Sequence, residues 1–315
     1  MSIKRKTDGK ETPGVTKKPK IDFFAPKTAV AKTGPSFNFS CKDTNATRLV
    51  AWNVNGIHSI LKDEQKRKIL IKYLDAEDPD ILILTETKFA QGKPDLQYLK
   101  TKFKYQYWGT DLRAGQAGTA ILSKIKPLAI VETGLPTWTP SASETKGRYV
   151  ELEFERLFVV GTYVPNSGEN FKSMDIKQKW NVTFKKHLRD LDSRKPVIWG
   201  GDFNCILQQN DLDSKALPYW DRMSGLSKTE REEFNNILNP TDDESRKFAD
   251  IWRHLHPDAA EYTHSSEKFG SWRLDSFILS ERIVGKASCC LIRHELEDLK
   301  LSDHWPVMLD FAELL

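Results

Sequence analysis

Short apolar runs alternate with longer amphipathic segments from residue 48 to the end of the chain. Runs rich in β-branched and aromatic residues, bounded by turn residues, predict strands at 48–54, 80–85, 105–109, 119–123, 149–154, 157–163, 196–200, 272–279 and 305–311. Apolar residues three and four positions apart predict helices at 64–74, 176–191, 228–238 and 248–255. Strands recur up to the last residues without an interior linker, so the pattern predicts one α/β domain over residues 46–315.

Residues 1–45 differ from this domain in composition. They are rich in Lys, Pro, Thr, Gly and Ser and have little periodic apolar content, which predicts a disordered tail. Residues 1–40 contain nine Lys and Arg against three Asp and Glu. The basic clusters at 5–6 and 17–20 match the two-part arrangement of a nuclear import signal, and a merely solubilising basic tail is the alternative.

Composition narrows the class of protein further. The formal net charge is +4, but residues 41–315 carry 39 basic against 41 acidic side chains, so binding of nucleic acid by the domain must depend on where its charges lie. No apolar run approaches the roughly 18 residues that span a bilayer, and we expect a soluble protein. Cys41, Cys205, Cys289 and Cys290 have neither disulfide nor zinc-ligand spacing, so we interpret them as reduced thiols.

Polar residues gather where the predicted strands end. The clusters are at 52–56, 85–88, 163–168, 201–204, 273–275 and 302–304. Each cluster alone is typical of a turn, but strand ends that meet at one edge of a sheet form a site. Carboxylate and amide oxygens with one imidazole suit a hard cation such as Mg²⁺. No glycine-rich nucleotide loop and no nucleophilic Ser or Cys with its base accompanies them.

Taken in order, TETK at 85–88, YVPN at 163–166, GDFN at 201–204, WRLD at 272–275 and SDH at 302–304 resemble one known family. It is the exonuclease III and apurinic/apyrimidinic endonuclease branch of the endonuclease/exonuclease/phosphatase superfamily, and the resemblance covers residues 48–315. The resemblance implies a four-layer α/β sandwich, two mixed β-sheets packed face to face and flanked by helices. It also implies a Mg²⁺-dependent hydrolase of base excision repair that incises DNA 5′ to abasic sites and trims blocked 3′ ends.

The resemblance implies roles at the matching positions. The residues that would hold Mg²⁺, with Mn²⁺ as a substitute, are Glu86, Asn53 and Asp303. Asp202 would deprotonate the attacking water with help from Asn204, and His304, oriented by Asp275, would contact the scissile phosphate. Tyr163 and Asn166 would donate hydrogen bonds to phosphate oxygens.

The pocket for a flipped-out abasic sugar would contain His264, Trp272 and Leu274. Relatives carry an aromatic residue where this chain has His264, so we expect a partly polar wall, with His264 and Trp272 on opposite sides of the sugar. Abasic-site preference is therefore less firmly implied than phosphodiester hydrolysis.

Two alternatives remain at this point: a relative that acts mainly as a 3′ exonuclease, as a 3′ phosphatase or on RNA, and a catalytically silent repair scaffold. The expected partner is double-stranded DNA with abasic sites or blocked 3′ ends, bound by a monomer away from membranes. Ile21–Phe24 partly matches a sliding-clamp-binding peptide. We expect a nuclear protein, with a mitochondrial fraction as a further option.

Overall fold

The computed structural model describes residues 35–40, 42–43, 45–89, 97–111, 113, 115–138, 145–241 and 247–312. The basic clusters of the predicted import signal and the segment Ile21–Phe24 lie outside the described residues, so both stay predictions, as does the division of the chain at residue 45. Within the described ranges, no helix is both long and apolar enough to cross a membrane.

Two six-stranded sheets form the centre of the fold, and a two-stranded hairpin stands apart from them. The first sheet has the order β13-β14-β1-β2-β4-β3 and the second β5-β6-β7-β8-β12-β9, while β10 pairs with β11. The strands are β1 Ala46–Asn53, β2 Ile81–Thr85, β3 Tyr105–Gly109, β4 Thr119–Ser123, β5 Ala129–Val131, β6 Tyr149–Glu153, β7 Phe158–Tyr163, β8 Val197–Asp202, β9 Phe248–Asp250, β10 His264–Ser266, β11 Gly270–Trp272, β12 Asp275–Ser280, β13 Ala287–Ile292 and β14 Val307–Ala312.

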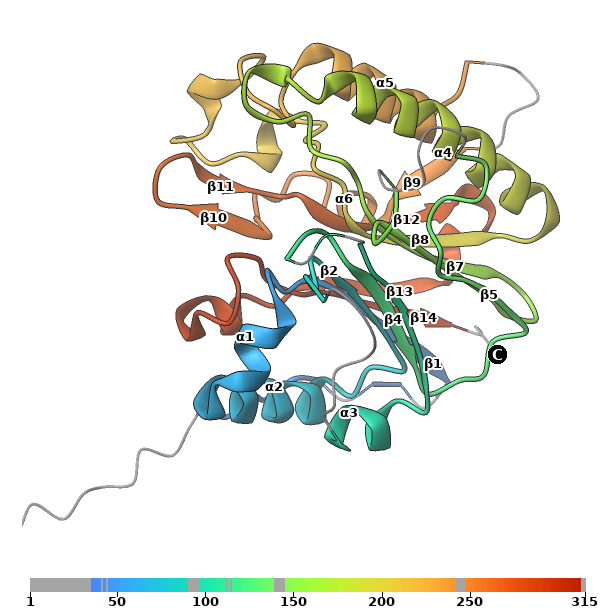
Figure 1. Ribbon diagram of the computed structural model, residues 1–315, viewed down its shortest axis with the longest axis vertical. Coiled ribbons are helices and arrows are strands. Elements are labelled where there is room, and N and C mark those ends of the chain that lie inside the picture. Colours follow the sequence, from blue (N-terminus) through green and yellow to red (C-terminus); the bar gives the residue numbers. More distant parts are fainter. Residues whose placement is uncertain are drawn as a thin grey trace, which may run out of the picture. The chain divides into compact units, whose positions relative to one another are not determined.

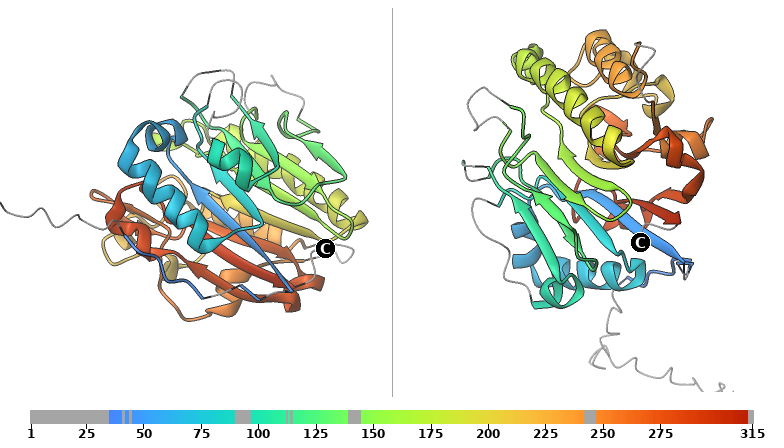
Figure 2. Two further views of the ribbon diagram at one scale, coloured as in Figure 1. Left: turned by 90° about the horizontal axis from the view of Figure 1, so that it is seen from below. Right: turned by 90° about the vertical axis from the view of Figure 1, so that its right-hand side faces the viewer.

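Both sheets are mixed. β1 runs parallel to β2 in the first sheet and β7 parallel to β8 in the second, while the other neighbours are antiparallel. β14, near the end of the chain, lies beside β1, as the red and blue strands of Figure 2 show. The carboxyl ends of the two parallel pairs, at Asn53, Thr85, Tyr163 and Asp202, are where the polar motifs begin.

Helices cover the outer face of each sheet, which gives four layers (Figure 1). α1, α2 and α3 flank the first sheet, and α4 and α5 flank the second. The helices are α1 Ile57–Lys62, α2 Glu64–Glu77, α3 Gln97–Lys102, α4 Met174–Arg194, α5 Lys228–Leu238 and α6 Ile251–Leu255, with short 3-10 helices η1 Glu169–Phe171, η2 Gln209–Asp211, η3 Leu217–Tyr219, η4 Glu281–Lys286 and η5 His294–Leu299. This is the predicted four-layer sandwich of two mixed sheets.

The inner faces of the sheets meet around Ile83 of β2. Opposite it lie Gly161 of β7 and Gly200 of β8, which present no side chain. A Cβ at Gly161 would lie 2.9 Å from Ile83 Cγ2, and one at Gly200 would lie 3.0 Å from Ile83 Cδ1. Real carbon contacts are longer than this, so the two glycines permit a close approach of the sheets that any other residue would prevent.

The structure corrects two of the predicted elements. The strand expected at 272–279 is divided into β11 and β12, because the buried Arg273 between them pairs with Asp211 and Asp250. The helix expected at 248–255 begins as the short strand β9, which pairs with the end of β12, and Asp250 then caps α6 by accepting from the Arg253 backbone N–H. The strands β5, β9, β10 and β13 and the helices α1 and α3 were not predicted.

A buried ion network joins three strands of the first sheet to α2. Arg48 of β1 is 2% exposed, and its guanidinium contacts Asp310 of β14 at 2.7 Å and Glu77 of α2 at 3.1 Å. Arg293, just after β13, also binds Glu77. The ring of Phe39 lies against Arg293, and the same ring packs on Tyr73, so a part of the segment assigned to the tail contacts the domain.

Arg48→Met should lower the free energy of unfolding by about 3–5 kcal/mol, because removing this partner leaves the buried carboxylate of Asp310 without a counter-charge. Urea unfolding followed by tryptophan fluorescence measures the change. Lys68→Met is the matched control, since Lys68 pairs with Glu64 on the surface, and it should leave the midpoint nearly unchanged. Equal shifts for both variants would show that the network contributes no more than a surface pair.

Candidate active site

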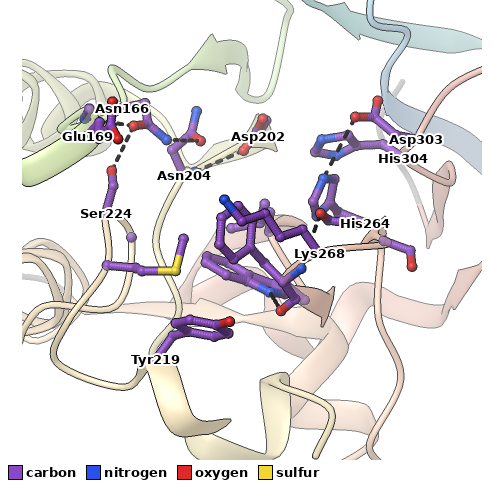
Figure 3. A pocket seen from close by; sticks show the side chains of 18 of the residues that line it. Asn166, Glu169, Asp202, Asn204, Tyr219, Ser224, His264, Lys268, Asp303 and His304 are labelled. Carbon is purple, nitrogen blue, oxygen red and sulfur yellow. Dashed lines mark hydrogen bonds and ion pairs between the residues drawn. The ribbon is translucent and has the colours of Figure 1, made fainter. Parts of the chain in front are cut away.

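A pocket of about 870 Å³ lies at the ends of the strands, between the two sheets and the β10-β11 hairpin (Figure 3). Most of the residues predicted from the sequence line it: Glu86, Tyr163, Asn166, Asp202, Asn204, His264, Trp272, Leu274, Asp303 and His304. Asn53 and Asp275 are buried directly behind the lining, and both hydrogen-bond to residues of the pocket. The structure thus brings all the predicted site residues together, although their roles stay predictions.

Asn53 connects the two sheets at the floor of the site. Its Nδ2 donates to Glu86 Oε1 at 3.0 Å, within the first sheet, and to Asp202 Oδ2 at 2.9 Å, in the second. Its Oδ1 accepts from the backbone N–H of Asn55 at 3.0 Å. Since Asn53 is fully buried and its amide is bonded at both ends, it holds the two carboxylates in fixed positions.

The surroundings of Glu86 favour a cation. The ammonium group of Lys88 lies 3.0 Å from Glu86 Oε2 and also contacts Asn55 Oδ1. Asp303 Oδ1 accepts from Asn55 Nδ2 at 2.9 Å, so a second carboxylate lies beside the Asn55 amide that Lys88 contacts. Burial acts to raise the pKa of Glu86, but hydrogen bonds from Asn53 and Lys88 and the charge of Lys88 hold it below its ordinary value. An anionic Glu86 with neighbouring amide and carboxylate oxygens fits a divalent metal ion.

Tyr163 supplies a neutral donor across the site from this group. It lines the pocket near Glu86 and Asp202. Burial and then the charges of Glu86 and Asp202 raise the pKa of Tyr163 well above its ordinary value, so it keeps its proton. The guanidinium of Arg148 lies 4.8 Å from the centre of the Tyr163 ring, and this cation–π contact holds the ring in place.

His304 belongs to a buried chain of hydrogen bonds. Its Nδ1 lies 2.7 Å from Asp275 Oδ2, which also accepts from Thr263 Oγ1 at 2.7 Å. The Thr263 hydroxyl in turn accepts from the backbone N–H groups of Leu274 and Asp275. Asp275 therefore holds the imidazole so that Nε2 faces the pocket.

The pKa values of both Asp202 and His304 are raised, which gives the two groups different roles near neutral pH. Burial and the charge of Asp275 raise the pKa of Asp202 to about 7. Burial acts to lower the pKa of His304, but the charge and hydrogen bond of Asp275 outweigh it and raise the pKa to about 10. A carboxylate that accepts a proton near neutrality thus lies beside an imidazolium that can bind an anion.

The side-chain amides of Asn166 and Asn204 are locked together. Asn166 Nδ2 donates to Asn204 Oδ1 at 3.0 Å, and Asn204 Nδ2 donates to the Val164 carbonyl at 3.0 Å. The Asn204 backbone adopts the left-handed region with φ 47°, where its N–H reaches Asp202 Oδ1 at 2.9 Å. Ser224 Oγ donates to Asn166 Oδ1 at 2.7 Å and fixes the orientation of that amide. The two amides can therefore offer defined hydrogen bonds to a ligand.

His264 and Trp272 form one wall of the pocket, not the opposite walls that we expected. They are directly paired residues of β10 and β11, and their rings touch edge to face with centroids 6.5 Å apart. No sugar fits between rings in contact, so a bound group must lie on one side of both. Burial and the charge of His304 lower the pKa of His264 to about 4, which makes its contribution to this wall a neutral imidazole.

Three contributors to the site were missed from the sequence. Thr263 could have been found, because it immediately precedes His264 and has the only aliphatic hydroxyl in the Tyr262-Thr263-His264 run. Arg148 and Ser224 carry no local signal, since neither belongs to a motif or to a periodic pattern. Their roles depend on contacts that only the folded chain makes.

Comparison with known proteins gives consistent matches. Residues 50–304 match the endonuclease/exonuclease/phosphatase family. The chain is 33% identical over 270 residues to the exodeoxyribonuclease of Bacillus subtilis (strain 168), covering 83% of this chain and 98% of the relative. It is 31% identical over 306 residues to the DNA repair nuclease APEX1 of Danio rerio, covering 91% of this chain and 90% of the relative.

Solved structures agree on the fold. An AP endonuclease from Archaeoglobus fulgidus superposes with a TM-score of 0.70 at 22% sequence identity, covering 84% of this chain and 99% of that chain. At this identity the likeness bears on the fold alone, and it supports the four-layer arrangement of two mixed sheets.

Glu86→Gln should weaken the binding of Mn²⁺, used as a spectroscopic probe, by at least about tenfold, because the amide removes the negative charge that the ion would neutralise. Electron paramagnetic resonance of free Mn²⁺ during titration measures the affinity. Glu169→Gln makes the same change of charge elsewhere in the pocket lining and is the matched control. Equal weakening in both variants would place the ion away from Glu86.

Proposed function

Because this chain belongs to the endonuclease/exonuclease/phosphatase family, we propose that it is a Mg²⁺-dependent DNA repair hydrolase that incises the phosphodiester backbone 5′ to abasic sites. Trimming of blocked 3′ ends is the accompanying activity. Its substrate is double-stranded DNA that carries either lesion, and the monomer suffices, since every proposed group comes from one chain.

One observation carries the proposal: Asp202 lies beside His304 and is joined through Asn53 to the carboxylate of Glu86. A metal-assisted phosphodiesterase uses a proton acceptor for water, a cationic partner for the phosphoryl oxygens and a metal ion, and the residues that would supply all three lie together at one pocket. A silent scaffold has no need of a buried carboxylate with a raised pKa, so this alternative has no support in the site.

The residues divide the reaction between them. Asp202 accepts the proton of the attacking water while the new oxygen–phosphorus bond forms, and Asn204 orients that water. Protonated His304, held by Asp275, binds the negative phosphoryl oxygens, and Tyr163 and Asn166 donate neutral hydrogen bonds to them. A divalent ion held by Glu86, with Asn53 and Asp303, would neutralise charge on the phosphate and on the departing oxygen.

The rim of the pocket suits DNA. Arg222 and Lys268 add cationic side chains for the backbone, while Met223, Phe269 and Trp272 offer an apolar surface for an exposed sugar or base. The Danio rerio relative is named as a DNA repair nuclease, which supports a nuclease role in DNA repair. The Bacillus subtilis relative is named as an exodeoxyribonuclease, which keeps 3′ exonuclease action as the second candidate.

The full chain should cleave a duplex with one tetrahydrofuran abasic analogue in Mg²⁺, and EDTA should abolish the cleavage. Asp202→Asn should lower kcat by at least about a hundredfold, the scale on which a positioned general base contributes. Single-turnover product formation on denaturing gels measures the rates. Asp221→Asn, an exposed carboxylate paired with Arg231, should keep the wild-type rate as a control.

Matched duplexes with a 3′ phosphate or a recessed normal end decide between the two candidate activities. Faster removal of 3′ nucleotides than abasic incision by the wild type would favour the exonuclease. Cleavage that persists undiminished in EDTA would remove the metal from the mechanism.

His264→Phe should raise the ratio of abasic incision to 3′-end trimming by several-fold. A phenyl ring replaces a neutral imidazole in the wall shared with Trp272, and pocket contacts of this size discriminate by roughly 1–3 kcal/mol. The measurement is kcat/KM on both duplexes. Trp272→Ala should lower kcat/KM for abasic incision more than for 3′ trimming. Equal changes for both substrates in both variants would show that this wall does not determine specificity.

A further inference from the structure

A lysine ammonium is buried directly behind the polar side of the pocket. Lys177, in the first turns of α4, is 1% exposed. Its Nζ donates to the carbonyl oxygens of Pro165 at 3.1 Å and Asn204 at 2.8 Å, and lies 3.8 Å from Glu230 Oε1. The two carbonyl oxygens accept hydrogen bonds from the ammonium group, and the Glu230 carboxylate balances its charge, which makes its burial tolerable.

Glu230, the partner of this lysine, is fully buried at the start of α5. Its carboxylate accepts from the backbone N–H of Gly225 at 2.9 Å, the backbone N–H of Ser227 at 3.2 Å and the Ser227 hydroxyl at 2.7 Å. Lys177 and Glu230 therefore join three separate segments: 163–168 after β7, 202–206 after β8, and 224–227 before α5.

These three segments carry the polar side of the pocket. They contribute Asn166, Asn204 and Ser224, whose side chains are linked to one another by hydrogen bonds. The Ile206 N–H donates to the Gly225 carbonyl at 2.9 Å, a further link between the second segment and the third. Neither Lys177 nor Glu230 belongs to the described lining of the pocket, so both act on it from behind.

We infer that Lys177 is a positioning residue for catalysis. It fixes the positions of the Asn166 and Asn204 side chains relative to each other. The inference rests on the proposed phosphodiester hydrolysis. The carbonyl oxygens of Pro165 and Asn204 both face the ammonium group and would repel each other without it. If the two carbonyl groups moved apart, both asparagine side chains would move with them. A displacement near 1 Å at a reacting centre can lower the rate about a hundredfold.

Lys177→Met keeps the length of the side chain and removes the charge. We expect kcat on the abasic duplex to fall between about tenfold and a hundredfold with KM changed less than about threefold, since the asparagines act on the transition state more than on binding. Lys177→Arg returns donors to the two carbonyls and should recover part of kcat. Unchanged kcat in Lys177→Met overturns the inference.

A double-mutant cycle separates positioning from stability. In an Asn166→Ala background, Lys177→Met should lower kcat by a clearly smaller factor than in the wild type, because one of the two side chains that Lys177 positions is already absent. The same loss in both backgrounds overturns the inference. Arg293→Met, which removes a buried cation from Glu77 of α2, is the matched control for stability and should leave kcat unchanged.

Hydrogen exchange tests the inference without a measurement of enzyme activity. Peptides that contain residues 163–168 and 224–227 should exchange faster in Lys177→Met and at the wild-type rate in Arg293→Met. No local change in Lys177→Met overturns the inference even if the enzyme cleaves abasic DNA. Local change in a chain that cleaves neither duplex would leave Lys177 as the organiser of these loops and refute the proposed function alone.

Discussion

The distance between the two sheets at Ile83 is the constraint on which the site depends. Glu86 follows Ile83 by three residues on one sheet, while Tyr163 and Asp202 follow Gly161 and Gly200 by two residues on the other. Because the glycines let the sheets approach at this point, the strand ends just beyond it are near enough for Asn53 to bond Asp202 and for His304 to bond Asp275 directly. The site is therefore a set of cross-sheet hydrogen bonds, and its dimensions are inherited from the core.

That core also holds features that are unfavourable on their own. Glu86 and Asn204 adopt left-handed backbone conformations, with φ of 47° at both. Asp275 Oδ1 is buried and has no hydrogen-bond partner among the described residues. Such groups persist where surrounding packing fixes them, and they concentrate here in one pocket. A stable scaffold of two packed sheets thus maintains a charged and locally strained centre.

The sequence predicted most of the long strands and the residues at their ends, because apolar runs and turn residues are local signals. It could not predict strands as short as β5, β9 and β10, whose existence depends on neighbours distant in the chain. The placement of His264 and Trp272 on opposite walls of the pocket was wrong for the same reason, since only the hairpin register puts them side by side. Lys177 escaped notice because lysine on an amphipathic helix normally faces solvent. Its burial follows from two carbonyl groups that no sequence pattern marks.

The β10-β11 hairpin is a separate ribbon, attached to the catalytic centre through the His264–His304 bridge and the Thr263 hydroxyl. Its outer residues have no part in either six-stranded sheet. Mutations there can accumulate without disturbing the core that sets the chemistry. Such a ribbon is a natural module for divergence: substrate range can drift within a lineage, or be redirected by laboratory selection, while the hydrolytic machinery stays the same.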